Sequence, residues 1–271
     1  MVFTWIEVAV GDLGVAVVIE DDVDVRNLLD AVLQQAGFEV HSAGTGRDGV
    51  DVARQRQANV ITLDVGLPDI DGFEVLRRIR QFSDAYVVML TGRNDELDTI
   101  TALQGGADDY IVKPFRPREL RARISAMLRR PRVAGSADEA AGSAADSGPV
   151  GASGTLRSRR STVLQHNGLA LDTETRTVAL RGTPLGLTRS EFDLLHELLR
   201  GTGAVRTRAD LVRVVRGEYY GEDTYISEAD ERAVEVHIGN LRRKLREDPQ
   251  DPRWLVTVRG VGYRLAPKRP E

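Results

Sequence analysis

The sequence predicts a five-stranded, doubly wound parallel α/β sheet followed by a small α+β domain. Three observations support this prediction. The first 130 residues alternate short apolar runs with helically spaced apolar residues, the composition changes abruptly at 131–158, and the remainder mixes short strand patterns with three helical ones. A length of 271 residues suits two ordinary domains.

The first domain is expected over residues 15–130. Its short apolar runs are typical of buried parallel strands, and they lie at 16–19, 38–41, 60–63, 86–90 and 110–112. Between the first two runs, Val25, Leu28, Leu29, Val32 and Leu33 have the spacing of one helix face. Helices that join parallel strands cover both faces of the sheet.

Two segments lie outside the predicted domains. Residues 131–158 contain 17 Ala, Gly or Ser among 28 residues, so they bury too little apolar surface to fold and are interpreted as a flexible linker. Residues 1–14 include Glu7 and Asp12 and lack the basic start of a signal peptide. They are interpreted as an N-terminal extension or a misassigned start.

The second domain is expected over residues 159–271. Strands are predicted at 167–171 and 177–180, and a terminal hairpin at 255–258 and 263–265. Thr188 and Glu191 have the spacing of a capping box that begins a helix, and Thr207 caps a second. A third helix, from about 231 to 247, presents one apolar stripe, formed by Val234, Ile238, Leu241 and Leu245.

Composition excludes several classes of protein. With no cysteine, the chain has no disulfide framework, thiolate metal site or cysteine nucleophile. No stretch of 18 residues lacks a charge, which excludes a membrane-spanning helix. Residues 1–130 carry 15 basic and 21 acidic side chains, whereas residues 159–271 carry 20 and 17. The basic second part is compatible with an anionic partner such as nucleic acid.

Polar residues follow the predicted parallel strands, where ligands bind in open α/β sheets. Glu20 and Asp21 follow the first strand, Asp64 ends the third, Thr91 ends the fourth and Lys113 follows the fifth. If the first and third strands are neighbours, three carboxylates meet and need a cation, for which Mg²⁺ is suited. Asp64 is then placed to act as a nucleophile toward a phosphoryl group.

Residues 15–130 resemble the flavodoxin-like receiver domain of two-component response regulators. The resemblance rests on Glu20-Asp21, Asp64 with Leu67-Pro68 and Asp71-Gly72, Thr91-Gly92, the run 106–110, and Lys113-Pro114-Phe115. It implies that Asp64 is the phosphoacceptor, that Mg²⁺ is held by Glu20, Asp21, Asp64 and the carbonyl of Gly66, that Thr91 and Tyr110 form a switch pair, and that Lys113 binds the phosphate.

The third helix of the second domain has a second stripe opposite its apolar one, flanked by Arg242 and Arg246 and formed by Arg232, Val236, Gly239, Asn240 and Arg243. A helix with an arginine-bearing face can lie in the major groove of DNA. The alternative is a charged face in contact with solvent. The predicted hairpin carries further basic residues, which favours the DNA interpretation.

Residues 163–267 resemble the winged-helix DNA-binding domain of the OmpR/PhoB family. The matching motifs lie at 187–195, 234–238, 241–245, 251–253 and 257–264. The resemblance implies a helix in the major groove and a wing in the minor groove, with DNA contacts from Arg232, Val236, His237, Asn240, Arg242, Arg243, Thr257 and Arg259. Gly239 and Asn240 depart from the arginines common at these positions.

The combined resemblance implies a phosphorylation-activated transcription factor and not an enzyme. Its implied partners are a sensor histidine kinase, double-stranded promoter DNA with repeated half-sites, and RNA polymerase, in the cytoplasm and without membrane association. A homodimer would form on phosphorylation through a face containing Asp108, Asp109, Glu119, Arg123 and Arg130. Two alternatives remain: a phosphatase of haloacid dehalogenase type, which needs an Asp where Gly66 lies, and a receiver that does not respond to phosphate.

Overall fold

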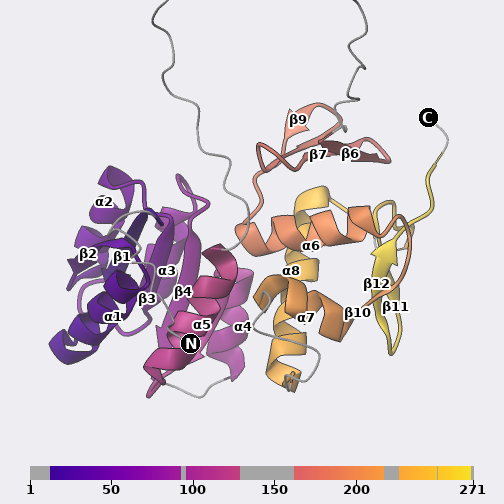
Figure 1. Cartoon of the computed structure of the whole chain (residues 1–271). Helices are drawn as coiled ribbons and strands as arrows, with labels where there is room; N and C mark the ends of the chain where they lie inside the picture. Colours follow the sequence, from indigo (N-terminus) through magenta and orange to yellow (C-terminus); the bar gives the residue numbers. More distant parts are fainter. Residues whose placement is uncertain (1–12, 93–95, 129–161, 217–225, 249, 270–271) are drawn as a thin grey trace, which may run out of the picture.

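A computed structural model describes residues 13–92, 96–128, 162–216, 226–248 and 250–269 (Figure 1). The predicted linker and most of the predicted extension lie outside these residues. Leu13 lies within them, and its backbone N–H donates to the carbonyl of Gly37 at 3.4 Å.

The first part of the chain is a five-stranded parallel sheet in the order β2-β1-β3-β4-β5, which confirms the predicted topology. Its strands are β1 (Val15–Ile19), β2 (Glu39–Ala43), β3 (Val60–Asp64), β4 (Tyr86–Thr91) and β5 (Asp109–Val112). The connecting helices are α1 (Val23–Gln35), α2 (Gly46–Gln55), α3 (Gly72–Ile79), α4 (Glu96–Gln104) and α5 (Pro117–Leu128). Strand order reverses between β1 and β3, so a crevice is expected beyond their carboxyl ends.

Each face of this sheet has its own apolar core. One core joins β1, β3 and β4 to α1 and α5, and the other joins the opposite side chains of these strands to α2, α3 and α4. Because both faces are covered, the strands are apolar on both sides. Asp22 caps the N-terminus of α1, because its carboxylate accepts from the N–H groups of Asp24 and Val25.

Gly72 allows the start of α3 to pack against the end of β3. A Cβ atom at this position would lie 2.3 Å from the carbonyl oxygen of Asp64 and 2.8 Å from Cα of Val65. We expect Gly72→Ala to lower the free energy of unfolding by about 1–3 kcal/mol, because backbone would have to move to accommodate the methyl group. Urea denaturation measures the change. In the control Gly92→Ala, the new Cβ lies within 4 Å of none of the described residues, so an equal loss there would contradict this explanation.

In the second part, the described residues form two antiparallel sheets and three helices around one core. The four-stranded sheet consists of β6 (Val163–His166), β7 (Leu169–Asp172), β8 (Thr177–Leu180) and β9 (Thr183–Pro184). The helices are α6 (Arg189–Arg200), α7 (Arg208–Arg216) and α8 (Glu228–Leu245), and the second sheet is β10 (Arg206–Thr207), β12 (Gly262–Leu265) and β11 (Leu255–Val258).

Most of the predicted elements are confirmed, with three differences. The strand predicted from 167 begins at Leu169, because Asn167 has a φ of 48° in the β6–β7 turn. The strands β6, β9 and β10 were not predicted. The third helix begins at Glu228 and not at about 231, because Ser227 and Asp230 form a capping box. The capping box of Thr188 and Glu191 at α6 is confirmed.

The two parts are in contact. Helix α8 lies against α4, and α7 lies against α5 (Figure 1). The α8 face that meets α4 is distinct from the stripe of Val234, Ile238, Leu241 and Leu245, which is buried in the core of the second part as predicted.

Candidate functional site

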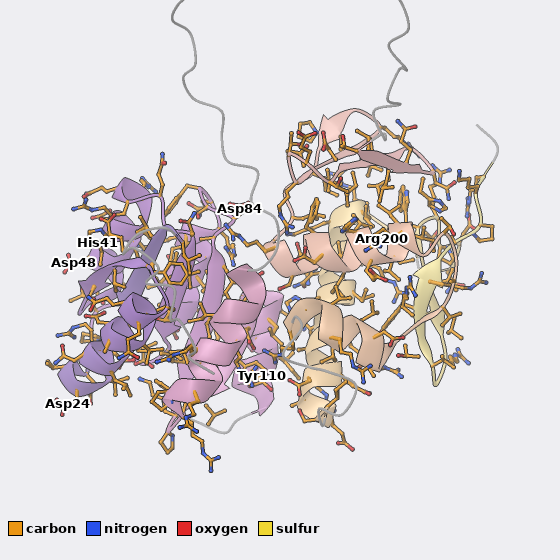
Figure 2. The ribbon with its side chains drawn as sticks, viewed as in Figure 1. Asp24, His41, Asp48, Asp84, Tyr110 and Arg200 are labelled. Atoms are coloured by element: carbon orange, nitrogen blue, oxygen red, sulfur yellow. The ribbon has the colours of Figure 1, made fainter. Side chains whose placement is uncertain are left out.

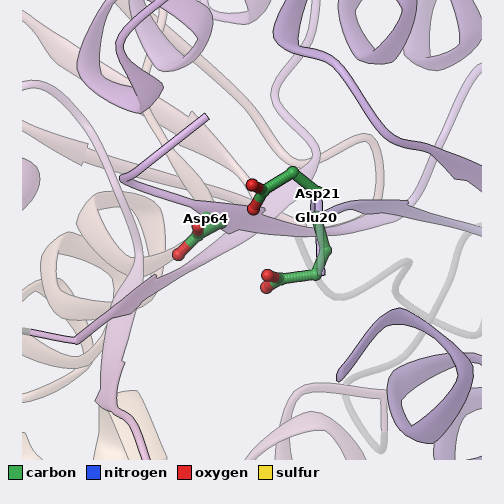
Figure 3. Close-up of side chains that lie close together, drawn as sticks. All are labelled: Glu20, Asp21 and Asp64. Carbon is green, nitrogen blue, oxygen red and sulfur yellow. The ribbon is translucent and has the colours of Figure 1, made fainter. Parts of the chain in front are cut away.

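The three predicted acidic ligands meet at the carboxyl ends of β1 and β3 (Figure 3). The strands β1 and β3 are neighbours in the sheet, and Ile19 pairs with Leu63. The residues that follow β1 therefore lie beside the end of β3. Glu20, Asp21 and Asp64 each place a carboxylate oxygen within 4.8 Å of the other two. Glu20 and Asp64 are buried, whereas Asp21 is exposed. One side of the cluster is therefore open to solvent.

Lys113 neutralises this cluster from the end of β5. Its Nζ lies 2.7 Å from Oε2 of Glu20 and 2.8 Å from Oδ1 of Asp64. Burial raises the pKa of Glu20, although the hydrogen bond from Lys113 opposes the shift. Burial alone would lower the pKa of Lys113, but its hydrogen bonds to Asp64 and Glu20 raise it. The lysine is therefore a fixed positive charge next to the Asp64 carboxylate.

The remaining predicted phosphate-site residues lie on neighbouring elements. Thr91 is buried at the end of β4, which pairs with β3. The backbone of Gly66 is close to the acidic cluster, since a Cβ at this position would lie 3.6 Å from Oδ2 of Asp64. Tyr110 is half-buried on β5, at the side of the first domain that faces the second (Figure 2).

The donor set fits a magnesium ion. Mg²⁺ prefers oxygen ligands and keeps several waters, and the three carboxylates offer oxygens on a partly open pocket. Close carboxylates repel one another unless a cation is present. Lys113 supplies one positive charge to this pocket. The arrangement can thus present the Asp64 carboxylate to a phosphoryl group beside the Lys113 ammonium group and a site for a divalent cation.

The predicted DNA-contacting residues fall into two groups. Arg232, Arg243, Thr257 and Arg259 are exposed, and Val236 and Arg242 are half-buried. Arg242 joins α8 to the β11–β12 hairpin, because it donates to Oγ1 of Thr257 at 2.7 Å and to the carbonyl of Leu255 at 3.1 Å. Arg242 therefore fixes the hairpin against α8.

Asn240 and His237 do not lie on that exposed surface. Asn240 is 3% exposed, and its Nδ2 donates to the carbonyl of Leu103 in α4 at 2.8 Å. His237 is 1% exposed. The first domain covers Asn240 in this arrangement, so the predicted contacts of Asn240 and His237 with DNA stay a prediction. Sequence periodicity does not reveal contacts between separate domains.

The predicted dimer-face carboxylates are occupied within the chain. Asp108 accepts from Arg80 at 2.7 Å and from the backbone N–H of Ser190 at 3.0 Å. Asp109 pairs with Arg123 at 3.1 Å and with Arg216. Arg130 and the side chain of Glu119 lie outside the described residues.

Arg80, Ser190 and Arg216 were missed as functional candidates. Arg80 and Arg216 each end or follow an amphipathic helix, where a basic residue is common as a favourable partner of the helix dipole. Ser190 contributes only a backbone N–H, which any residue type could donate. No signal in the sequence therefore distinguishes them.

Burial between the domains lowers the pKa of His237, although the carboxylates of Asp108 and Glu191 oppose the shift and Arg216 reinforces it. A lowered histidine pKa means that the docked state binds the proton more weakly than a state with this ring in water. The neutral His237 ring therefore contributes fully to the stability of the docked state above about pH 6.5. This contribution is lost as the pH falls through the lowered pKa and the ring is protonated. We expect the His237 imidazole, assigned by NMR with His237→Gln, to titrate below 6.5. Titration at or above that value would contradict its burial.

Comparisons with known proteins agree with the two-part architecture. Residues 16–125 match the response regulator receiver domain, and residues 182–265 match the C-terminal domain of transcriptional regulatory proteins. The chain is 39% identical over 249 residues to transcriptional regulatory protein AfsQ1 of Streptomyces coelicolor, covering 92% of this chain and 96% of AfsQ1. It is 37% identical over 248 residues to sensory transduction protein RegX3 of Mycolicibacterium smegmatis, covering 92% and 97%.

A solved structure of a RitR mutant has a TM-score of 0.66 and 25% sequence identity, and the similarity covers 93% of this chain and 99% of RitR. A receiver with an acidic pocket, joined to a winged-helix domain, defines a DNA-binding response regulator. The chain belongs to the OmpR/PhoB family of two-component response regulators, which are transcription regulators and not enzymes. Among the described residues, no helix has the length and apolar character needed to cross a membrane.

Proposed function

We propose that Asp64 accepts a phosphoryl group from a sensor histidine kinase and that this modification activates binding to promoter DNA. The observation that carries the proposal is the placement of the Asp64 carboxylate, 2.8 Å from Lys113 and within 4.8 Å of the Glu20 and Asp21 ligand oxygens. Residues 15–130 would be the receiver unit and 159–271 the DNA-binding unit, connected by the linker 131–158.

In the proposed transfer, an Oδ atom of Asp64 forms the new bond to phosphorus while the bond from phosphorus to the donor breaks. The electron pair of that bond leaves with the donor, which is the imidazole nitrogen of a phosphohistidine or the acetate oxygen of acetyl phosphate. Bound Mg²⁺ would neutralise charge on the phosphoryl oxygens. Glu20, Asp21, Asp64 and the Gly66 carbonyl would hold it, and Lys113 and Thr91 would contact the phosphate.

DNA affinity separates this function from its alternatives. A DNA duplex is first selected from a random pool with phosphorylated protein, and its affinity for the protein is measured with and without acetyl phosphate and Mg²⁺. We expect a gain in affinity that requires both reagents. Equal affinity under all conditions would identify a receiver that does not respond to phosphate, and sustained hydrolysis of small phosphate esters would identify a phosphatase.

The proposed DNA surface consists of the exposed part of α8 and the adjoining hairpin. Arg232, Arg243 and Arg259 are exposed there, and basic side chains supply the salt-dependent part of DNA affinity. Asn240 has an amide that can pair with adenine N6 and N7 in the major groove once the helix leaves α4. RNA polymerase is the proposed further partner at the promoter.

The proposed active form is a symmetric dimer through α4, β5 and α5, in which Asp109 pairs with Arg123 of a second copy and Asp108 with Arg130. We expect Arg123→Glu to weaken the phosphorylated dimer, since it places like charges together, and Asp109→Arg in the same chain to restore it partly. Exposed ion pairs contribute only about 0–1 kcal/mol each, so the dimer should dissociate at moderate salt. Sedimentation of the phosphorylated variants measures these changes.

Arg121→Glu is the matched control, because Arg121 lies on the same helix but contacts Gln35 of α1. Thr99→Lys on α4 should tighten the dimer by supplying a partner for Glu119. A dimer that tolerates Arg123→Glu would show that the receivers pair through another face.

A further inference from the structure

The strand β11 lies at the edge of the sheet β10-β12-β11, so among the described residues one of its sides has no strand partner. Side chains from the C-terminal end of α8 and the residues just after it occupy that side. The backbone N–H of Leu255 donates to Oε2 of Glu247 at 3.0 Å, and the carbonyl of Leu255 accepts from Arg242 at 3.1 Å. These two side chains thus satisfy a strand edge that would otherwise be open to another strand.

Glu247 is the centre of this contact. It directly follows Arg246, which ends α8 with a φ of 54°. Besides the bond from Leu255, its carboxylate accepts at Oε1 from the backbone N–H groups of Arg253 at 2.5 Å and Trp254 at 2.6 Å. Hydrogen bonds to a charged acceptor are roughly twice as strong as those between neutral groups. Because the three N–H groups belong to consecutive residues, they fix the position and direction of the chain as it enters β11.

A second side chain holds the same entry point from another part of the domain. Asn167, in the β6–β7 turn, donates from Nδ2 to the carbonyl of Arg253 at 2.7 Å, and its own carbonyl accepts from the indole of Trp254 at 3.2 Å. Trp254 is buried in the core of the second part. The base of the hairpin is therefore anchored, whereas Arg259 and Gly260 at its tip are exposed. The contacts at the base determine where the tip points.

We propose that Glu247 sets the angle between α8 and the β11–β12 hairpin, and thereby allows one domain to contact the major and the minor groove of DNA at the same time. Glu247 is a positioning residue, because its carboxylate is occupied by backbone N–H groups and would be repelled by phosphate. The residues expected to touch DNA are others, such as exposed Arg232 on α8 and Arg259 on the hairpin. The inference rests on the proposed function for the use of these two elements in DNA binding, and not for phosphorylation.

Pre-organisation is the physical reason for an effect on affinity. A hairpin that moved relative to α8 would lose conformational freedom when both elements bind, and this loss would weaken binding. Linked contacts strengthen binding only where the geometry lets both engage at once. The hairpin lies on the side of the second domain away from the receiver (Figure 1), so its anchoring does not depend on contacts with the first domain.

Glu247→Gln in the full-length protein tests the proposal. The amide has nearly the same size, but it places an NH₂ donor where one carboxylate oxygen accepts hydrogen bonds. Loss of a negative charge by itself should raise the affinity for a polyanion, whereas loss of positioning should lower it, so the sign of the change separates the two effects. We expect binding to the selected duplex to be weaker than that of wild type by about tenfold or more, with both proteins treated with acetyl phosphate and Mg²⁺.

Methylation by dimethyl sulfate distinguishes lost positioning from a general loss of structure. The reagent modifies guanine N7 in the major groove and adenine N3 in the minor groove, so one experiment reports on both grooves. The duplex carries A·T pairs on both sides of the guanines contacted by α8. At protein concentrations that saturate the duplex, Glu247→Gln should still protect guanine N7, but the protection of adenine N3 seen with wild type should be lost.

Glu228→Gln is the matched control, since it removes the same charge from an exposed position in the first turn of α8. It should protect both atoms as wild type does and should not weaken binding. Should Glu247→Gln fail to melt cooperatively, Glu247→Asp replaces it. That variant keeps the charge but is too short to reach all three N–H groups, and we expect the same separation of the two protections.

Two results in a folded Glu247 variant would overturn the proposal: wild-type affinity with both atoms protected, or an equal loss of both protections. Wild type that leaves adenine N3 unprotected would also overturn it, because α8 and the hairpin would then not contact both grooves. A failure of the proposed function gives a different result, namely equal affinity of wild type with and without acetyl phosphate. The comparison of wild type with Glu247→Gln under identical conditions would remain decisive in that case.

Discussion

Asp64→Asn should abolish both stable phosphorylation and the phosphate-dependent gain in DNA affinity. The amide is nearly the same size as the carboxylate but is not a nucleophile toward phosphorus. The site around it should remain, because Glu20 keeps its contact with Lys113 at 2.7 Å. The measurements are labelling by radioactive acetyl phosphate with Mg²⁺, and the affinity for the selected duplex before and after that treatment.

Asp51→Asn is the control for the loss of one carboxylate. Asp51 is exposed on α2 and is not part of the acidic cluster. This variant should be labelled and should bind DNA like wild type. An equal phosphate-dependent gain in Asp64→Asn and wild type would show that the receiver is activated through another residue.

Lys113→Met should lower the stability of the metal-free protein and make that stability strongly dependent on Mg²⁺. Lys113 is the shared partner of Glu20 and Asp64, both of which are buried. Removing one partner of a buried ion pair typically costs about 3–5 kcal/mol, because it leaves uncompensated charge. A divalent cation bound by the carboxylates would offset much of that loss. Urea denaturation with EDTA and with saturating Mg²⁺ measures the two stabilities.

Lys268→Met provides the comparison, since Lys268 is exposed near the end of the described chain. It should change stability little, with or without Mg²⁺. An identical deficit in Lys113→Met under both conditions would show that the carboxylates do not bind the metal. Phosphorylated Lys113→Met should also gain little DNA affinity, because its phosphate lacks the lysine cation.

The first domain and its acidic pocket were predictable because local signals and topology agree. Apolar runs identify the strands, and parallel pairing requires that their carboxyl ends share one edge of the sheet. Once β1 and β3 are neighbours, Glu20 and Asp64 have to approach each other. The capping box of Thr188 and Glu191 was predictable for a similar reason, since its contacts span only three residues.

The state of the DNA-binding helix was not predictable from its own sequence. The apolar stripe of α8 correctly identified the side facing the core, but Asn240 is covered by α4, whose Leu103 lies 137 residues earlier in the chain. The ion pair of Asp109 with Arg216 likewise joins residues of different domains that are far apart in the sequence. Polar contacts between separate domains have no periodicity, so only the structure reveals which polar residues of an exposed-looking face are buried.

The central claim, that Asp64 receives the phosphoryl group, is tested most directly by locating the modified residue. Borohydride reduces an aspartyl phosphate to homoserine, and peptide mass spectrometry then identifies the position. Wild-type protein treated with acetyl phosphate and Mg²⁺ should contain homoserine at position 64, and the same protein treated in EDTA should not. Homoserine at another aspartate, or none at position 64 under conditions that increase DNA affinity, would contradict the account.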